Sequence, residues 1–133
     1  MADFRLFLPD DAGGVMGEVD ERGVLTFFIC AAAGSPIRGT ELFYLMMRAF
    51  GDRVRAVQGV WRRGYGGSPS VNLDRVNERT AAGASLMSAV RATWTYTRAA
   101  RWGFTRATPI GVEGTPGSYT KIDVLLEKVG EAP

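Results

Sequence analysis

The chain has 133 residues, 46% of them hydrophobic and 23% charged, with a formal net charge of +2. This is an ordinary globular composition, and the length predicts a single domain over residues 1–133 with one core. There is no histidine and one cysteine, which excludes Ser-His-Asp and Cys-His triads, histidine-containing zinc sites and an internal disulfide framework. No metal is therefore expected, and any chemistry must use carboxylates, tyrosine, hydroxyls, arginine or the main chain.

The longest apolar run, residues 24–33, is far too short to span a bilayer, and the first residues lack the pattern of a signal peptide. The chain is therefore expected to be soluble. Two locations fit this expectation: the cytoplasm, or a target cell into which a larger secreted bacterial protein delivers the domain.

The first part of the chain predicts three strands. Residues 2–8 can form an opening strand, and residues 15–19 and 24–31 form a hairpin around a turn that ends in Gly23. The second hairpin strand is apolar on both faces. This pattern predicts a central strand covered on both sides, with Cys30 buried in it.

A helix is predicted from about residue 39 to residue 50. Its apolar residues recur on one face: Leu42, Phe43, Met46, Met47 and Phe50. Thr40 or Ser35 can cap its first turn, and Gly51 can end it. A strand follows at residues 54–61, so that strand, loop, helix and strand form a βαβ unit with parallel strands.

The second part predicts a loop at residues 62–70, a short helix at 71–79, and a long helix over 86–102 with one broad apolar stripe. A strand opens at residue 104. The last strand, residues 118–128, alternates apolar and polar residues, which is typical of an edge-ward strand with one wet face.

The fold class is therefore α/β with α+β character. We expect a mixed, mainly antiparallel sheet with one βαβ crossover and two main helices. The predicted core spans about residues 15–128, with a loop and short-helix insertion at about 62–85.

This order of elements resembles the core of the Gcn5-related N-acetyltransferases. In that family a loop of pattern Arg/Gln-x-x-Gly-x-Gly/Ala joins a central strand to a helix, whose first N–H groups hold the pyrophosphate of acetyl-coenzyme A. Residues 36–41 stand at this loop and read Pro-Ile-Arg-Gly-Thr-Glu, and Gly103-Phe104 follow the later helix as they often do in the family. Pro36 and Glu41 depart from the loop pattern.

The resemblance implies acetyl-coenzyme A as cofactor and a small-molecule or protein acceptor. It implies cofactor contacts by four loop residues: Ile37, Arg38, Gly39 and Thr40. Proton transfer would fall to Tyr96 or Glu41, since a catalytic histidine is excluded.

A second resemblance is to the C-terminal toxin domains of bacterial Rhs-type polymorphic toxins. It is carried by residues 39–43, Gly59-Val60-Trp61, and Thr93-Trp94-Thr95 before Gly103-Phe104. It implies a bacterial effector with a cognate immunity protein, and it leaves the reaction open.

Four polar residues are further site candidates: Asn72, Asn77, Thr93 and Thr95. Each can line a cleft or orient a substrate, and each can equally cap a helix or bond to the main chain. Arg62 and Arg63 belong to an arginine cluster that suits phosphate or nucleic acid, or forms a solvated face.

The leading hypothesis is an acyl-coenzyme A-dependent N-acetyltransferase-like domain, acting as a bacterial toxin effector. One alternative is a toxin domain with nuclease-type or other chemistry that uses Arg62 and Arg63 on phosphate. The other is a non-enzymatic module that binds a partner protein.

Overall fold

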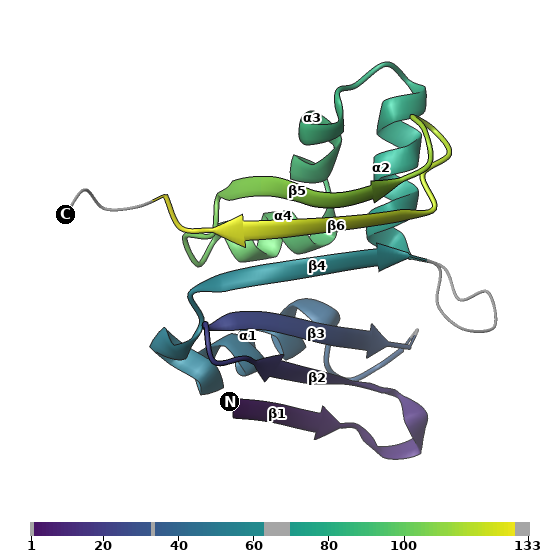
Figure 1. The fold of residues 1–133 in the computed structure, drawn as a ribbon. Coiled ribbons are helices and arrows are strands. Elements are labelled where there is room, and N and C mark those ends of the chain that lie inside the picture. Colours follow the sequence, from purple (N-terminus) through teal and green to yellow (C-terminus); the bar gives the residue numbers. More distant parts are fainter. Residues whose placement is uncertain (1, 33, 63–69, 130–133) are drawn as a thin grey trace. The chain divides into compact units, whose positions relative to one another are not determined.

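The computed structural model describes residues 2–32, 34–62 and 70–129, and Figure 1 labels its helices and strands. The chain divides into two compact units, Met1–Val57 and Gln58–Pro133. Strand β4 belongs to both units, since its first two residues complete the first unit and its remaining residues open the second. The single domain expected over residues 1–133 stays a prediction.

The first unit contains an antiparallel sheet, one helix and the start of a fourth strand (Figure 1). Its elements are β1 (Ala2–Phe7), β2 (Gly13–Val19), β3 (Val24–Ala31), α1 (Gly39–Phe50) and the start of β4 (Ala56–Arg62), with 3-10 turns at Pro9–Asp11 and Gly51–Arg53. Val15 of β2 lies opposite Leu6 of β1 and Ile29 of β3. β4 starts parallel to β3, with Leu25 opposite Val57. The predicted βαβ crossover is therefore confirmed.

The core of the first unit lies between α1 and one face of the β1-β2-β3 sheet. The predicted apolar stripe of α1 is buried: Leu42, Phe43, Met46, Met47 and Phe50. Val15, Val19 and Leu25 are the buried apolar side chains that the described part of these strands contributes. Gly17 lies on the same face, where a Cβ would come 2.6 Å from the Met46 Sδ atom. Since each fully buried large apolar side chain contributes about 1.5–3 kcal/mol, this layer is the main source of the unit's stability.

The opposite face of the same sheet is exposed, and this corrects two predictions. The sequence predicts that β3 is covered on both faces and that Cys30 is buried, and both predictions are wrong. Phe28 of β3 is 64% exposed, and the Cys30 thiol is exposed as well. The apolar composition of a strand reports the character of both faces, but whether a second layer covers them is decided by the rest of the fold.

The second unit combines the remainder of β4 with three helices and a hairpin. Its further elements are α2 (Val71–Ala81), α3 (Leu86–Arg91), α4 (Trp94–Ala100), β5 (Arg106–Glu113) and β6 (Lys121–Glu127). In hydrogen-bonded order the strands are β1-β2-β3-β4-β6-β5, mostly antiparallel, with a parallel β3–β4 pair. The predicted α+β class with a mixed sheet is confirmed. β6 is an interior strand, so the prediction of an edge-ward strand at residues 118–128 is wrong.

The last strand in this order, β5, is irregular. It pairs antiparallel with β6, but the register shifts between Pro109 and Gly111. Pro109 also lacks an N–H group for pairing. The edge strand of the second unit is thus interrupted near its middle.

The long helix predicted over residues 86–102 is divided at Thr93, so that prediction is wrong. Thr93 has extended backbone angles (φ −76°, ψ 157°) and is the N-cap of α4. Its hydroxyl donates to the Val90 carbonyl oxygen at 2.7 Å and accepts from the Tyr96 N–H at 3.2 Å. The side chain thereby bonds both to the end of one helix and to the start of the next, which is how threonine competes with a continuous helical main chain.

Candidate functional site

The loop between β3 and α1 is shaped by Ser35. Its hydroxyl donates to the Ile37 carbonyl oxygen at 2.7 Å and accepts from the Ile37 N–H at 3.3 Å. The resulting turn leads directly into Arg38, which is the N-cap of α1 with extended angles (φ −81°, ψ 158°) and no side-chain capping bond. The predicted caps, Thr40 and Ser35, do not hold this position.

The four residues expected to contact a cofactor are consecutive at this turn. Ile37, Gly39 and Thr40 are half-buried, while Arg38 is exposed. The first N–H groups of a helix have no intrahelical acceptor, and its N-terminus carries a partial positive charge. Glu41 is exposed in the same first turn, where its carboxylate complements the helix dipole but would oppose a bound anion. This helix end therefore presents one exposed cation and one exposed anion.

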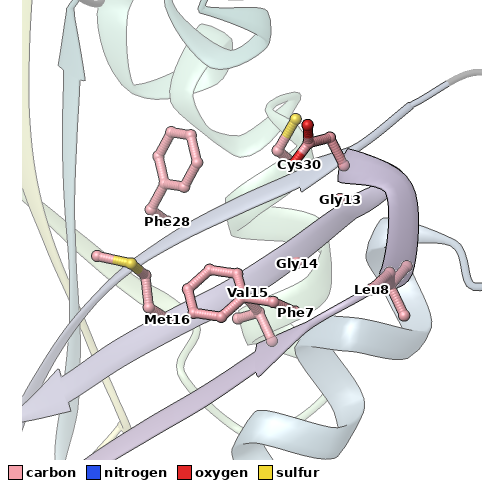
Figure 2. Close-up of a pocket in the computed structure, with 9 residues that line it drawn as sticks. Phe7, Leu8, Gly13, Gly14, Val15, Met16, Phe28 and Cys30 are labelled. Atoms are coloured by element: carbon pink, nitrogen blue, oxygen red, sulfur yellow. The ribbon is translucent and has the colours of Figure 1, made fainter.

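A pocket of about 260 Å³ lies on the exposed face of the β1-β2-β3 sheet. Figure 2 shows Phe7, Met16 and Phe28 on the neighbouring strands that form it. Gly14 lies beneath the Phe7 ring, since a Cβ there would come 2.8 Å from Phe7 Cδ1. The thiol-bearing Cys30 is the register partner of Gly14. The sequence signalled this surface only through the apolar residues on both faces of β3.

A polar pocket of about 460 Å³ lies elsewhere in the first unit. Its charged lining residues are of both signs: Asp20, Glu21, Asp52, Arg53 and Arg55. The N–H groups of Val24 and Arg22 donate to the Asp20 carboxylate and hold its pKa below the ordinary value. Arg53 and Arg55, which belong with Arg48, Arg62 and Arg63 to the arginine cluster of the sequence, thus lie among carboxylates, which offsets their attraction for phosphate.

Asn72, on the first turn of α2, is bonded to the start of α4. Its Nδ2 donates to the Thr95 Oγ1 at 2.9 Å, and its Oδ1 accepts from the Thr95 N–H at 3.0 Å. Thr93 is fully buried and Thr95 is 2% exposed. The structure therefore joins Asn72 to Thr95 by two hydrogen bonds between α2 and α4, while Thr93 bonds to Val90 and Tyr96 at the break between α3 and α4.

Asn77, the fourth polar candidate, holds the loop before β6. Its Oδ1 accepts from the Tyr119 N–H at 2.7 Å, and its Nδ2 donates to the Tyr119 carbonyl oxygen at 3.0 Å. One turn later, the Thr80 hydroxyl accepts from the Gly117 N–H at 2.9 Å. Through Asn77 and Thr80, the α2 helix thus bonds to the main chain of a loop that lies about forty residues later in the chain.

The remaining predicted site residues are spread over the chain. The Tyr96 hydroxyl donates to the Thr105 carbonyl oxygen at 2.8 Å. Glu41 belongs to the first compact unit and Tyr96 to the second. Arg62 is exposed at the end of β4, and Arg63 lies outside the described residues.

Asp123 of β6 is a carboxylate that the sequence places on a wet strand face. Its side chain is only 21% exposed, and its Oδ2 lies 3.7 Å from Lys121 Nζ. Within the described residues, its Oδ1 is buried and has no hydrogen-bond partner. The alternation of apolar and polar residues along the strand did not indicate this burial.

The described part of the chain contains no cluster of three or more metal-ligating side chains and no helix long and apolar enough to cross a membrane. Comparison with models of known protein families gave no match. Neither the curated proteins nor the solved structures gave a significant match.

Proposed function

We propose that the chain is an acyl-coenzyme A-dependent N-acetyltransferase-like domain whose cofactor loop is residues 37–40. The observation that carries the proposal is the parallel β3–α1–β4 crossover, in which α1 begins at the loop that follows β3. In sheets built from such crossovers, ligands bind beyond the carboxyl ends of the strands, where helices begin. The resemblance of this loop to the acetyltransferase loop names the ligand.

The loop offers two attractions for a pyrophosphate. The first N–H groups of α1 provide donors and a partial positive charge, as at other phosphate sites on helix N-termini. The exposed Arg38 guanidinium can bind phosphate oxygens in a bidentate manner. Glu41 opposes these attractions, so we expect its carboxylate to point away from the phosphates when a cofactor is bound.

In the proposed reaction the amine nitrogen of an acceptor attacks the thioester carbonyl carbon of the acyl cofactor. The carbon–sulfur bond breaks, the amide forms, and the amine's proton passes to the departing thiolate through a protein group. Glu41 or Tyr96 would assist this proton transfer, with Tyr96 first having to release its bond to Thr105. The acceptor is a small molecule or a protein amine.

Thermal unfolding with acetyl-coenzyme A tests the proposal. A ligand at one hundred times its Kd stabilises the native state by about 2.7 kcal/mol, which raises the Tm of a chain of this size by roughly 10 °C. The Arg38→Ala variant should lose most of this rise, because a charge-assisted hydrogen bond contributes about 1.5–3 kcal/mol. Arg48→Ala is the matched control, since Arg48 is an exposed arginine in the last turn of the same helix. An unchanged Tm at millimolar cofactor would refute the proposal.

The effector part of the proposal rests on the resemblance to polymorphic-toxin domains. It places the domain in a target bacterium and gives it a cognate immunity protein as partner. Growth arrest on expression in bacteria, reversed by Arg38→Ala, supports an acyl-transfer effector. Normal growth at high expression of the folded chain argues against it.

The second candidate function is a protein-binding module, which the exposed apolar face of the β1-β2-β3 sheet favours. Phe7 and Phe28 are each 64% exposed there and Met16 is 44% exposed. Exposed groups of large apolar side chains commonly mark interaction sites. A Phe28→Ser variant that keeps acetyl-coenzyme A binding but loses a copurifying partner would separate this function from catalysis. The nuclease alternative requires cleavage of RNA or DNA that disappears in Arg62→Ala.

A further inference from the structure

Strand β1 has one main-chain edge that faces away from β2. Leu8 N–H donates to the Gly13 carbonyl oxygen at 2.9 Å, directly after the register pair of Phe7 with Gly14. In an antiparallel pair, residues whose main chain bonds to the neighbour alternate with residues whose main chain points the other way. Since Leu8 bonds to β2, Asp3, Arg5 and Phe7 direct their N–H and C=O groups to the outer edge. Among the described strands, β1 is at the end of the hydrogen-bonded order.

The two charged residues of this edge are of opposite sign. Asp3 and Arg5 are two positions apart, so both side chains lie on the exposed face of the sheet. The Arg5 Nε lies 3.7 Å from the Asp3 Oδ2, and both side chains are 63% exposed. An exposed pair of this kind contributes little and is easily exchanged for another partner.

We propose that β1 pairs antiparallel with β1 of a second copy of the chain, about a two-fold axis at Phe4. Asp3 then lies opposite Arg5 of the second copy, and Arg5 lies opposite its Asp3. Because these are the residues with outward main-chain groups, each of the two pairs exchanges two N–H···O bonds, with Cα atoms about 5.5 Å apart. The ion pairs form directly across the new strand boundary.

Charge selects this register over its neighbours. The outward main-chain groups belong to alternate residues, so the register can shift only in steps that bring such residues opposite each other. One shift places Asp3 opposite Asp3 of the second copy, and the other places Arg5 opposite Arg5. Like charges directly opposite each other destabilise a strand pair. The proposed register is the one of these three in which both charges meet opposite charges.

The other face of the edge supports the same axis. Phe4 is half-buried against α1, where its ring meets the Phe50 ring edge-on at 6.3 Å between centroids. At the axis Phe4 lies opposite Phe4 of the second copy with Cα atoms about 4.5 Å apart, which allows the two rings to touch. β1 also contains neither proline nor glycine, and its register with β2 is continuous from Ala2 to Phe7. A proline and a β-bulge, two devices that commonly blunt an edge strand, are thus missing from β1, and its charged residues are the two that the proposed pairing uses.

Charge-reversal variants test the proposal by analytical ultracentrifugation of the whole chain over a range from about 5 to 500 µM, since a short strand interface predicts weak association. The wild-type chain should form a dimer. Asp3→Arg and Arg5→Asp should each weaken it at least about tenfold, because each creates two like-charge pairs. The double variant D3R/R5D should dimerise like the wild type. Glu21→Arg, an exposed charge reversal in the β2–β3 turn, is the matched control and should dimerise normally.

The decisive measurement mixes the two single variants in equal amounts. Asp3→Arg presents two arginines and Arg5→Asp presents two aspartates, so the mixture should form a heterodimer although neither variant self-associates. Formation of this heterodimer also shows that both variants are folded. A wild-type chain that stays monomeric at the highest concentration overturns the proposal, and so does a dimer that Asp3→Arg leaves intact. Failure of the mixture to associate overturns the proposed register.

Discussion

Replacing Asn77 by alanine tests whether this polar residue supports the fold. Its amide makes two bonds to the main chain of Tyr119, at 2.7 and 3.0 Å, and Tyr119 is only 9% exposed. Each bond contributes about 1 kcal/mol net, and a buried N–H or C=O left without a partner adds to the cost. Asn77 itself is half-buried, so water can reach part of the vacated space. We expect Asn77→Ala to lower the free energy of unfolding by about 2–3 kcal/mol.

Urea unfolding followed by circular dichroism measures this change. A loss of this size lowers the Tm by roughly 6–12 °C for a chain of this length. Asn77→Asp should be at least as destabilising at neutral pH, because it keeps the acceptor for the Tyr119 N–H but sets a carboxylate oxygen against the Tyr119 carbonyl. Glu78→Ala, a change at the next and exposed position of α2, should stay within about 0.5 kcal/mol of the wild type. If Asn77→Ala proves as stable as Glu78→Ala, the structural interpretation of Asn77 is refuted.

Three further predictions concern the first unit. The Cys30 thiol is exposed, so a maleimide should label it in the folded chain within a few-fold of its rate in urea, and labelling only after unfolding would contradict the structure. The lowered pKa of Asp20, held down by the Val24 and Arg22 N–H groups, gives stability that is present above its ordinary value of 3.8 and is lost as the pH falls through the folded value. Asp20→Asn should therefore be less stable than the wild type at neutral pH, with the gap closing as unfolding is measured at progressively lower pH. Gly17→Ala should cost about 1–3 kcal/mol, because the new methyl group would come 2.6 Å from Met46 Sδ; a Tm equal to that of the wild type would mean that α1 yields without strain.

The elements that the sequence predicts correctly depend on local patterns. The α1 helix has an apolar stripe with a spacing that only a helix can bury on one side, and Gly51 ends it with a positive φ of 59°. The β2–β3 hairpin is bounded by a turn in which Asp20 bonds to two N–H groups within four residues. Both signals are contained in fewer than fifteen consecutive residues.

The errors arise where distant residues decide the outcome. The apolar stripe of residues 86–102 continues across Thr93, so its period alone cannot show a break. The break depends on a hydroxyl that bonds to the main chain on both sides and on Asn72, which bonds to Thr95 from another helix. Similarly, the residues of β3 alone do not indicate that Phe28 is 64% exposed.

The candidate site shows the same division. The loop at residues 35–40 could be located from sequence, because a small-residue loop between a strand and a striped helix is a local pattern. The pairing of Asn77 with Tyr119 could not be located, since the two residues are far apart in the chain and neither has a distinctive neighbourhood. The apolar pocket around Phe7 and Met16 was missed for the same reason, because three separate strands contribute to it.

The irregular strand β5 limits how far the chain can assemble. Edge strands that pair freely at both ends of a sheet can stack protein upon protein without limit, which is the route to fibres. Pro109 removes one N–H donor from β5, and the shift in register beside Gly111 bends the strand. If β1 pairs with β1 of a second copy, the strands that the structure describes leave no regular edge to which a third molecule could bind. Because β1 is regular and β5 is interrupted, assembly would stop at the dimer. A concentrated solution of this protein would therefore not polymerise.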